Sequence, residues 1–251
     1  MKLSVIIPAH NEAESIGGTV AGVSGALRAA NVPHEILVVN DHSCDRTAEV
    51  LTTLAGTVPE LRWVENRGLG RGFGHAVRRG LESFAGDAAC IVMADASDDP
   101  ADIVQYYRKL QEGYECVFGS RFVRGSVVCG YPPHKLVLNR LANGFIKLLF
   151  GLPFSDVTNA FKCYRRNVIE GIQPLLACHF NLTVEMPLKA IVRGYSYAVI
   201  PINWRGRLRG VSKLRIQEMG SRYLFIVLYV WLEKLLARGD YRRADAAAGV
   251  R

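Results

Sequence analysis

The first 120 residues alternate between short apolar runs and longer segments in which apolar positions recur at helical spacing. The short runs are rich in branched residues, which is typical of buried strands. The predicted strands are residues 3–9, 34–40, 61–66 and 87–95, and the predicted helices are residues 14–30, 44–55, 74–85 and 100–113. Strands alternating with helices indicate parallel βαβ units. We therefore expect an α/β fold with a doubly wound sheet covered by helices on both faces.

The pattern changes after residue 120. Residues 132–151 carry apolar positions three and four apart beside a polar face, which predicts a long amphipathic helix. A strand-rich region, a basic segment and an apolar helix at 216–236 follow. We assign residues 1–215 to a catalytic domain, and residues 216–251 to an amphipathic helix suited to membrane association and a mobile tail. The alternative for both amphipathic helices is that they pack in a core or an oligomer interface.

Composition narrows the classes of partner and compartment. The chain has 251 residues, 49% hydrophobic content, a formal net charge of +8 and a pI of about 9.3. Such a charge favours anionic partners such as nucleic acid, acidic lipids or phosphorylated molecules. The six cysteines form no CxxC pair, so we interpret them as reduced thiols of an intracellular protein. The longest apolar run, residues 223–232, is too short to cross a bilayer.

Polar residues follow three of the predicted strands. The first strand leads to Asn11 and Glu12, the second to Asp41, and the fourth to the acidic segment 95–99. Because the carboxyl ends of parallel strands meet at one edge of a sheet, these groups are expected to surround a single ligand. The alternative is that each segment is only a turn with a helix cap, for which Asp45, Ser97 and Asp98 are suited.

A glycine-rich segment, "NRGLGRGFGHAV" at residues 66–77, lies between the second and fourth strand ends. Backbone N–H groups of such a loop before a helix can bind phosphates. The segment has neither the GxGxxG register of dinucleotide-binding folds nor the GK[ST] of a P-loop. By itself it therefore predicts either a phosphate site or a flexible connector.

Seven segments occur in the order found in family 2 glycosyltransferases, and the chain resembles the dolichol-phosphate (polyprenyl-phosphate) mannose or glucose synthase branch. The resemblance covers about residues 3 to 215. It implies a GT-A fold, which is Rossmann-like with a mostly parallel sheet flanked by helices, a nucleotide-sugar donor and inversion at the anomeric carbon. The segments are "VIIPAHNEAESI", "VVNDHSCDRT", "NRGLGRGFGHAVRRGL", "IVMADASDDP", "GSRF", "DVTNAFKCYRR" and "NWRGRLRGVSKL".

The resemblance also implies a donor site and a metal site. Asp41 occupies the position of the aspartate that contacts base or ribose. Met93 stands where the family has its first metal-binding aspartate, which leaves Asp95 and Ser97 as the implied metal contacts. A thioether does not ligate a hard cation, so the expectation of Mg²⁺ or Mn²⁺ is weakened. The implied donor-binding residues are Pro8, Ala9, Asn11, Glu12, Asp41, Arg71, Gly74 and Asp95.

Catalytic and acceptor residues are implied in the same way. The catalytic candidates are Asp95, Asp98 and Arg121, and the segment resembling "RGVSKL" lies near the acceptor phosphate in the family. Its alternative is a solvated basic loop. Asp156, Thr158 and Asn159 are candidates for the sugar or acceptor pocket. The implied acceptor-binding residues are Arg121, Arg205, Arg209, Ser212 and Lys213.

The resulting expectation is an inverting transferase on the cytoplasmic face of a membrane. It moves a hexose from a donor of the GDP-mannose or UDP-glucose type to a polyprenyl or dolichyl phosphate. An anionic phosphate acceptor needs no strong general base. One alternative is a saccharide or other hydroxyl acceptor with Asp98 or Asp99 as base. The second alternative is a basic nucleic-acid-binding protein. The sequence lacks RNP, KH and helix-turn-helix signals, so no nucleic-acid partner is expected.

Overall fold

A mostly parallel seven-stranded sheet forms the centre of the molecule, in the order β3-β2-β1-β4-β7-β5-β8. The computed structural model describes residues 1–68, 70–206 and 216–243. The neighbours β3-β2-β1-β4 are parallel, β7 is antiparallel to both β4 and β5, and β8 is parallel to β5. The strands are β1 (Leu3–Ala9), β2 (His34–Asn40), β3 (Leu61–Glu65), β4 (Ala88–Ile91), β5 (Cys116–Ser120), β7 (Lys162–Arg165) and β8 (Tyr197–Pro201).

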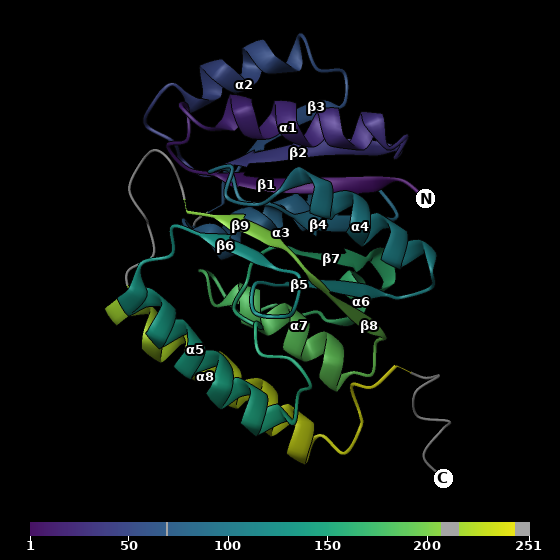
Figure 1. The fold of residues 1–251 in the computed structure, drawn as a ribbon, viewed down its shortest axis with the longest axis vertical. Helices are drawn as coiled ribbons and strands as arrows, with labels where there is room; N and C mark the ends of the chain where they lie inside the picture. Colours follow the sequence, from purple (N-terminus) through teal and green to yellow (C-terminus); the bar gives the residue numbers. More distant parts are fainter. Residues whose placement is uncertain (69, 207–215, 244–251) are drawn as a thin grey trace.

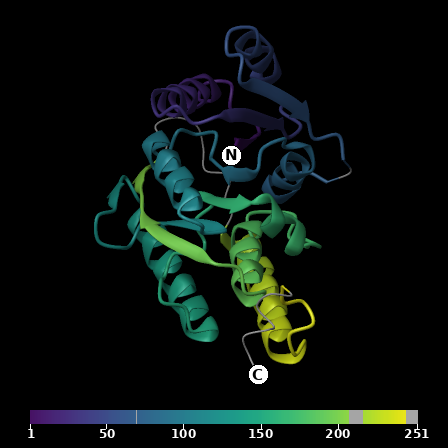
Figure 2. The ribbon, with the colours of Figure 1, turned by 90° about the vertical axis from the view of Figure 1, so that its right-hand side faces the viewer.

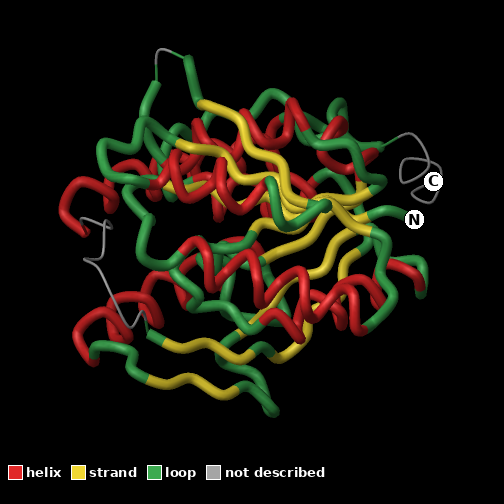
Figure 3. The backbone as a smooth tube through the Cα atoms, turned by 90° about the horizontal axis from the view of Figure 1, so that it is seen from above, coloured by secondary structure: helices red, strands yellow, loops and turns green. Residues whose placement is uncertain are grey.

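Helices cover both faces of this sheet, as Figure 3 shows from above. One face packs against α1 (Ile16–Ala29), α2 (Thr47–Ala55) and α4 (Pro100–Gln111). The opposite face packs against α3 (Phe73–Ser83), α5 (Pro133–Phe150), α6 (Arg166–Gly171), α7 (Leu182–Val192) and α8 (Ile216–Leu236). The prediction of a doubly wound α/β fold is therefore confirmed.

Strand β1 explains why a continuous apolar run predicts this architecture. All seven of its residues are buried. Ile6 packs into the core on the α3 side, whereas Val5 and Ile7 pack into the core on the α1 side. Alternate side chains of a strand point to opposite faces, so a strand covered on both sides must be apolar throughout.

The region after β5 contains strands where the sequence predicted them, at β7, β8 and β9 (Asn203–Arg205), but α6 and α7, which lie between β7 and β8, were not expected. Helix α7 is buried over most of its circumference and contains Pro187. Its polar residues Glu185 and Lys189 are buried with the apolar ones, so the sequence of α7 does not divide into a buried apolar face and an exposed polar face. A small parallel sheet of β6 (Val127–Cys129) and β9 was also not expected.

Helices α5 and α8 extend from the same end of the molecule (Figures 1 and 2). Each buries one stripe, formed by Ile146 and Phe150 on α5 and by Ile226, Val227 and Val230 on α8. Helix α8 packs mainly against α7. The proposed boundary at residue 215 therefore separates α8 in sequence, but not in packing. The predicted mobile tail lies largely outside the described residues.

Candidate active site

A cavity of about 870 Å³ opens at the carboxyl ends of β1, β2 and β4. Its lining includes Pro8 from β1, Asp41 from just after β2, and Asp95 from the turn after β4. The three polar strand ends thus surround one space, as the sequence predicts. The cavity continues between α5 and α8, so one hollow joins a polar end to an apolar end.

Asp41 fixes the glycine-rich loop at the polar end. Its Oδ1 accepts a hydrogen bond from Asn66 Nδ2 at 2.7 Å, and its Oδ2 accepts one from the backbone N–H of Gly72 at 2.8 Å. Gly72 has φ +128°, and a β-carbon there would lie 2.7 Å from Nδ1 of His179. Glycine is therefore required at this position by both backbone conformation and space. Gly72 therefore lines the cavity, while Arg67, Gly68 and Arg71 of the same loop are exposed.

His10 lies beside Asp41 in the cavity lining. Its Nδ1 is 2.7 Å from the main-chain oxygen of Asp41. A carbonyl oxygen only accepts hydrogen bonds, so Nδ1 must carry the proton. The neutral His10 ring therefore has Nε2 as an acceptor, a consequence that the sequence alone did not give.

The turn after β4 brings Asp95, Asp98 and Met93 to the cavity wall. The backbone N–H of Ser97 donates to Asp95 Oδ1 at 3.2 Å, and that of Met93 donates to Asp98 Oδ2 at 3.0 Å. Burial, aided by the negative charge of Asp95, raises the pKa of Asp98 to about 7, although the Met93 hydrogen bond acts to lower it. The polar wall therefore contains two neighbouring carboxyl groups, of which Asp95 is partly exposed and Asp98 is buried.

This donor set fits a cation that arrives with a phosphate ligand. Among the described residues, no group of three or more His, Cys, Asp or Glu side chains is arranged to hold a metal. Mg²⁺ in phosphate sites is commonly held by one or two carboxylates, with waters and substrate oxygens completing the shell. Asp95 and Asp98 can supply those carboxylates, whereas Met93 cannot contribute.

Asp99 has a structural role that the sequence offered instead for Asp98. Its Oδ1 accepts the backbone N–H of Ala101 and caps α4, while its Oδ2 accepts from Asn203 Nδ2 at 3.2 Å. Asp99 is absent from the described cavity lining, and Asp98 is part of it. Asp45 accepts the backbone N–H of Thr47 at the start of α2, as expected of a capping residue.

Arg121 lines the cavity and forms an ion pair with Asp156. Asp156 is fully buried, and Arg121 is 9% exposed. Burial acts to lower the pKa of Arg121, but the charge of Asp156 outweighs it and keeps this pKa above its ordinary value. Thr158 and Asn159, on the loop that follows Asp156, also line the cavity.

The other end of the cavity lies between α5 and α8. Two cationic side chains line it, Lys135 at the start of α5 and Arg222 on α8. Neither was singled out as a site residue from the sequence, although the helices that carry them were identified as amphipathic. The apolar lining from these helices is Leu138, Ala142, Phe145, Ile146, Leu224 and Val227.

Several sequence-predicted site residues take other positions. Asn11 accepts the backbone N–H of Cys44 through Oδ1 at 2.7 Å, which ties two loops together. Gly74 packs against the backbone of Cys178, where a β-carbon would lie within 2.5 Å. Arg71 donates to the main-chain oxygen of His42, and Arg205 is exposed on β9. These four residues are not in the cavity lining. Arg209, Ser212 and Lys213 lie outside the described residues.

Of the residues implied for donor, metal and catalysis, the cavity lining contains Pro8, Ala9, Glu12, Asp41, Asp95, Ser97, Asp98 and Arg121. Spatial convergence does not by itself assign a role to any of them. Their roles as donor, metal or catalytic residues stay predictions.

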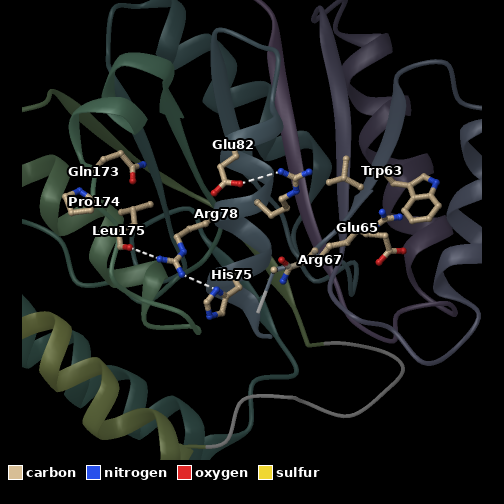
Figure 4. A pocket seen from close by; sticks show the side chains of 13 residues that line it. Trp63, Glu65, Arg67, His75, Arg78, Glu82, Gln173, Pro174 and Leu175 are labelled. Carbon is tan, nitrogen blue, oxygen red and sulfur yellow. Dashed lines mark hydrogen bonds and ion pairs between the residues drawn. The ribbon is translucent and has the colours of Figure 1, made fainter. Parts of the chain in front are cut away.

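A second cavity, also of about 870 Å³, lies behind the glycine-rich loop, between β3, α3 and residues 173–175 (Figure 4). His75 belongs to this cavity and not to the lining of the first. Its Nδ1 is 3.1 Å from Nη2 of Arg78, whose Nη1 donates to the carbonyl of Leu175. Burial, and then Arg78, lower the pKa of His75. Arg78 therefore joins α3 to residue 175, and the His75 ring lies against Gly70 of the loop, where a β-carbon would be 2.1 Å from its Nε2.

Comparison with known proteins places the architecture in a family. The model of the family "Glycosyl transferase family 2" matches residues 4–172. The chain belongs to this family. Its sheet, flanking helices and strand-end cavity are those of a GT-A fold. Among the described residues of this family 2 member, no helix is long and apolar enough to cross a membrane.

Two curated relatives are similar along most of the chain. The dolichol-phosphate mannosyltransferase of Pyrococcus furiosus is 32% identical over 218 residues, covering 86% of this chain and 60% of that protein. The polyprenol monophosphomannose synthase of Mycolicibacterium smegmatis is 31% identical over 215 residues, covering 84% and 80%. The family 2 member thus spans about three fifths of the length of the Pyrococcus protein.

Solved structures support the fold. Glucosyl-3-phosphoglycerate synthase from Mycobacterium tuberculosis in complex with UDP matches with a TM-score of 0.65 and 19% identity, covering 93% of this chain and 79% of that one. The same enzyme with Mn²⁺, UDP and phosphoglyceric acid matches with a TM-score of 0.67 and 18% identity, covering 93% and 78%. At this identity the likeness concerns the fold alone.

Proposed function

We propose that this family 2 member transfers a hexose, with inversion, from a nucleoside diphosphate sugar to a polyprenyl phosphate at the cytoplasmic face of a membrane. The observation that carries the proposal is a single cavity with a carboxylate-lined end at the strand termini and an apolar end between α5 and α8. A nucleotide sugar suits the first end, and a lipid phosphate suits the second. The names of the two curated relatives support the same acceptor class.

The residues of the cavity suit direct displacement at the anomeric carbon. An oxygen of the lipid phosphate forms the new bond to this carbon as its bond to the nucleoside diphosphate breaks, and the nucleoside diphosphate leaves with the electron pair. The acceptor oxygen is already anionic, so the protein must mainly hold two anions together. Arg121, Lys135 and Arg222 line the cavity and can offset that repulsion. A bound divalent cation, held by Asp95 and Asp98, would neutralise charge on the leaving diphosphate.

Exposed apolar side chains on α5 and α8 support attachment to a lipid surface. Leu148 is 84% exposed, Leu141 67% and Phe225 62%. An amphipathic helix with such residues and nearby lysines or arginines binds at the interface of an anionic bilayer. The cavity reaches these same two helices, so a lipid could enter it from the membrane. The other large exposed apolar side chains of the pair are Val137, Leu138, Phe145, Leu224, Leu228, Leu232, Leu235 and Leu236.

A hydroxyl acceptor is the competing reaction, and it requires a base. Asp98 is the candidate, since it lines the cavity with a pKa raised by burial to about 7. Asp98→Asn should reduce transfer to a hydroxyl by about 100-fold or more, the size of a general-base contribution. Transfer to a lipid phosphate needs no deprotonation, so it should lose only the contribution of Asp98 to cation binding and should recover when the divalent cation is raised to saturation.

The deciding experiment measures whether a labelled sugar is transferred to a lipid or to a water-soluble product. The protein is incubated with polyprenyl phosphate in anionic vesicles, a divalent cation and either labelled GDP-mannose or labelled UDP-glucose, and the products are extracted into organic solvent. The expected result is label in the organic phase that depends on the lipid phosphate. Label transferred to a water-soluble product alone would reject the lipid acceptor.

A further inference from the structure

A buried lysine lies behind the wall of the cavity, in the segment "DVTNAFKCYRR" but not among the residues to which the sequence assigned a role. Lys162 begins β7 and is 1% exposed. Its Nζ donates hydrogen bonds to three main-chain oxygens: that of Val157 at 2.9 Å, that of Thr183 at 3.2 Å, and that of Asn159. Lysine is rarely buried so fully without a carboxylate partner. Here the partners are backbone carbonyls.

The three carbonyls belong to two separate walls of the cavity. Val157 and Asn159 lie on the loop that carries lining residues 158–160, and Thr183 is a lining residue in the first turn of α7. The same loop is fixed from its other side by α5, because Asn143 Oδ1 accepts the backbone N–H of Val157 at 2.7 Å. Lys162 therefore joins the loop to α7, while Asn143 joins it to α5.

The geometry of this cage favours the charged form of the side chain. Three acceptors match the three N–H bonds of an ammonium, whereas a neutral amine has two and would direct its lone pair at an oxygen. Burial opposes this and lowers the pKa of Lys162 to about 7, while Asp156 acts to raise it. The charged groups that act on Lys162 are Asp156, Arg121 and Asp98. The contact that α7 makes with Lys162 is the main-chain carbonyl of Thr183.

The charges around Lys162 determine how strongly its ammonium acts on anions in the cavity. Asp156 is engaged by Arg121 through both carboxylate oxygens, so these two charges offset each other. Lys162 then adds one positive charge beneath a cavity where two anions are to meet. A charge buried in a medium of low dielectric acts over a longer distance than an exposed one.

We propose that Lys162 is a positioning residue of the transfer reaction, whose ammonium locks loop 157–160 against α7 and adds a positive charge that helps to hold the diphosphate. The inference rests on the proposed function for the identity of that anion. Lys162 touches no substrate. It acts by holding loop 157–160 in place and by the electrostatic attraction of its charge for the diphosphate.

The test uses inorganic pyrophosphate as the probe, with binding measured by calorimetry on the full chain in EDTA at pH 6 and pH 9. Lys162→Met preserves length and apolar packing and removes the charge. Its affinity for pyrophosphate should be about tenfold weaker than that of the wild type at pH 6, and within about twofold at pH 9, where the wild-type lysine is also neutral. Equal affinities at pH 6, or the same loss at both pH values, would overturn the proposal.

A matched control removes a different buried lysine. Lys189 and Glu185 are both 0% exposed and form an ion pair of 2.8 Å, and neither is in the cavity lining. The double variant Glu185→Gln/Lys189→Met should bind pyrophosphate as the wild type does, within about twofold, at both pH values. A comparable loss in this control would contradict a specific role of Lys162.

The wild-type protein provides the decisive measurement if Lys162→Met does not fold. The ¹³Cε resonance of Lys162 is titrated with and without pyrophosphate. Binding and protonation are linked reciprocally, so a tenfold preference for the ammonium form must raise the titration midpoint by about one pH unit. An unmoved midpoint would refute the proposal. Because neither measurement uses sugar or lipid, a wrong acceptor would appear only in the extraction assay.

Discussion

Arg121 and Asp156 form a bidentate ion pair at the edge of the cavity, with Nε–Oδ2 and Nη2–Oδ1 distances of 2.9 Å and 2.7 Å. The backbone N–H of Arg121 also donates to Asp156 Oδ2 at 2.7 Å. Asp156 therefore fixes both the main chain and the guanidinium of Arg121. The pair joins the segment after β5 to the loop before β7, two segments that the sequence separates by 35 positions.

Removing one partner of this pair should destabilise the fold. Asp156→Ala leaves the guanidinium of Arg121 buried without its counterion, and we expect the free energy of unfolding to fall by about 3 to 5 kcal/mol. Urea denaturation of the variant and the wild type measures it. The double variant Arg121→Met/Asp156→Leu should lose less than Asp156→Ala alone, because no charge is left buried. A loss below about 1 kcal/mol in Asp156→Ala would show that the pair contributes little.

Asp98 should make stability depend on pH in a stated direction. Its pKa is raised by burial from 3.8 to about 7. Between these values the folded state keeps the proton and the unfolded state has lost it, so the contribution of Asp98, complete below about pH 4, declines as pH rises to about 7. Asp98→Asn cannot ionise. Between pH 4 and pH 8, we expect the free energy of unfolding of the wild type to fall by about 2 to 4 kcal/mol more than that of the variant.

The measurement is urea unfolding of both proteins from pH 4 to pH 8 in EDTA. Asp102 has a pKa raised by burial to about 6 and contributes in the same direction. The difference between variant and wild type isolates Asp98, since Asp102 is present in both. Parallel pH curves for the two proteins would mean that Asp98 titrates normally.

Asp95 should be required for transfer. It is the partly exposed carboxyl of the turn after β4 and lines the cavity. Asp95→Asn retains shape but removes a charge suited to a divalent cation, so we expect the transfer rate to fall by at least about 100-fold. The melting temperature serves as the control for folding. Turnover like that of the wild type would disprove its metal role.

Lys135 should act on the lipid phosphate. It lines the cavity from the first turn of α5, whereas Lys147 on the same helix does not. Lys135→Met should raise the KM for polyprenyl phosphate by about 5- to 20-fold while leaving nucleotide affinity unchanged, because it removes one charged contact to phosphate. Lys147→Met is the matched control. Equal effects of the two substitutions would indicate a general electrostatic attraction to the membrane.

The exposed apolar face should bind lipid. Leu141→Glu/Leu148→Glu places two charges on α5 at positions that are 67% and 84% exposed, so folding should be unaffected. Sedimentation with anionic vesicles should fall by about tenfold or more, because each buried leucine contributes about 1.5 to 3 kcal/mol. Leu176→Glu, at an exposed leucine outside both helices, is the control. Unchanged sedimentation of the α5 variant would exclude this face as the attachment surface.

Local regularities in the sequence were enough to predict most of the fold. The centre of the predicted strand 34–40, residues 36–39, is apolar because both sides of the sheet are covered, and β2 has the predicted bounds. The antiparallel β7 was not predictable, since strand direction depends on long-range pairing. Helix α7 was missed because it lacks a solvent-exposed polar face. The cavity residues at the strand ends were predictable because parallel strands present their carboxyl ends together.

The sequence by itself determined the order of strands and helices up to residue 113, the position of the acidic turns and the amphipathic character of α5 and α8. Each of these features follows from residue spacing within a single segment. Only the tertiary structure decided which of these residues share a space. It placed Asp98 in the cavity and Asp99 on a helix cap, although the two are adjacent in the chain. It also buried Lys162 among three carbonyls from two segments. Such contacts arise from packing between distant segments, and no local pattern of residues encodes them.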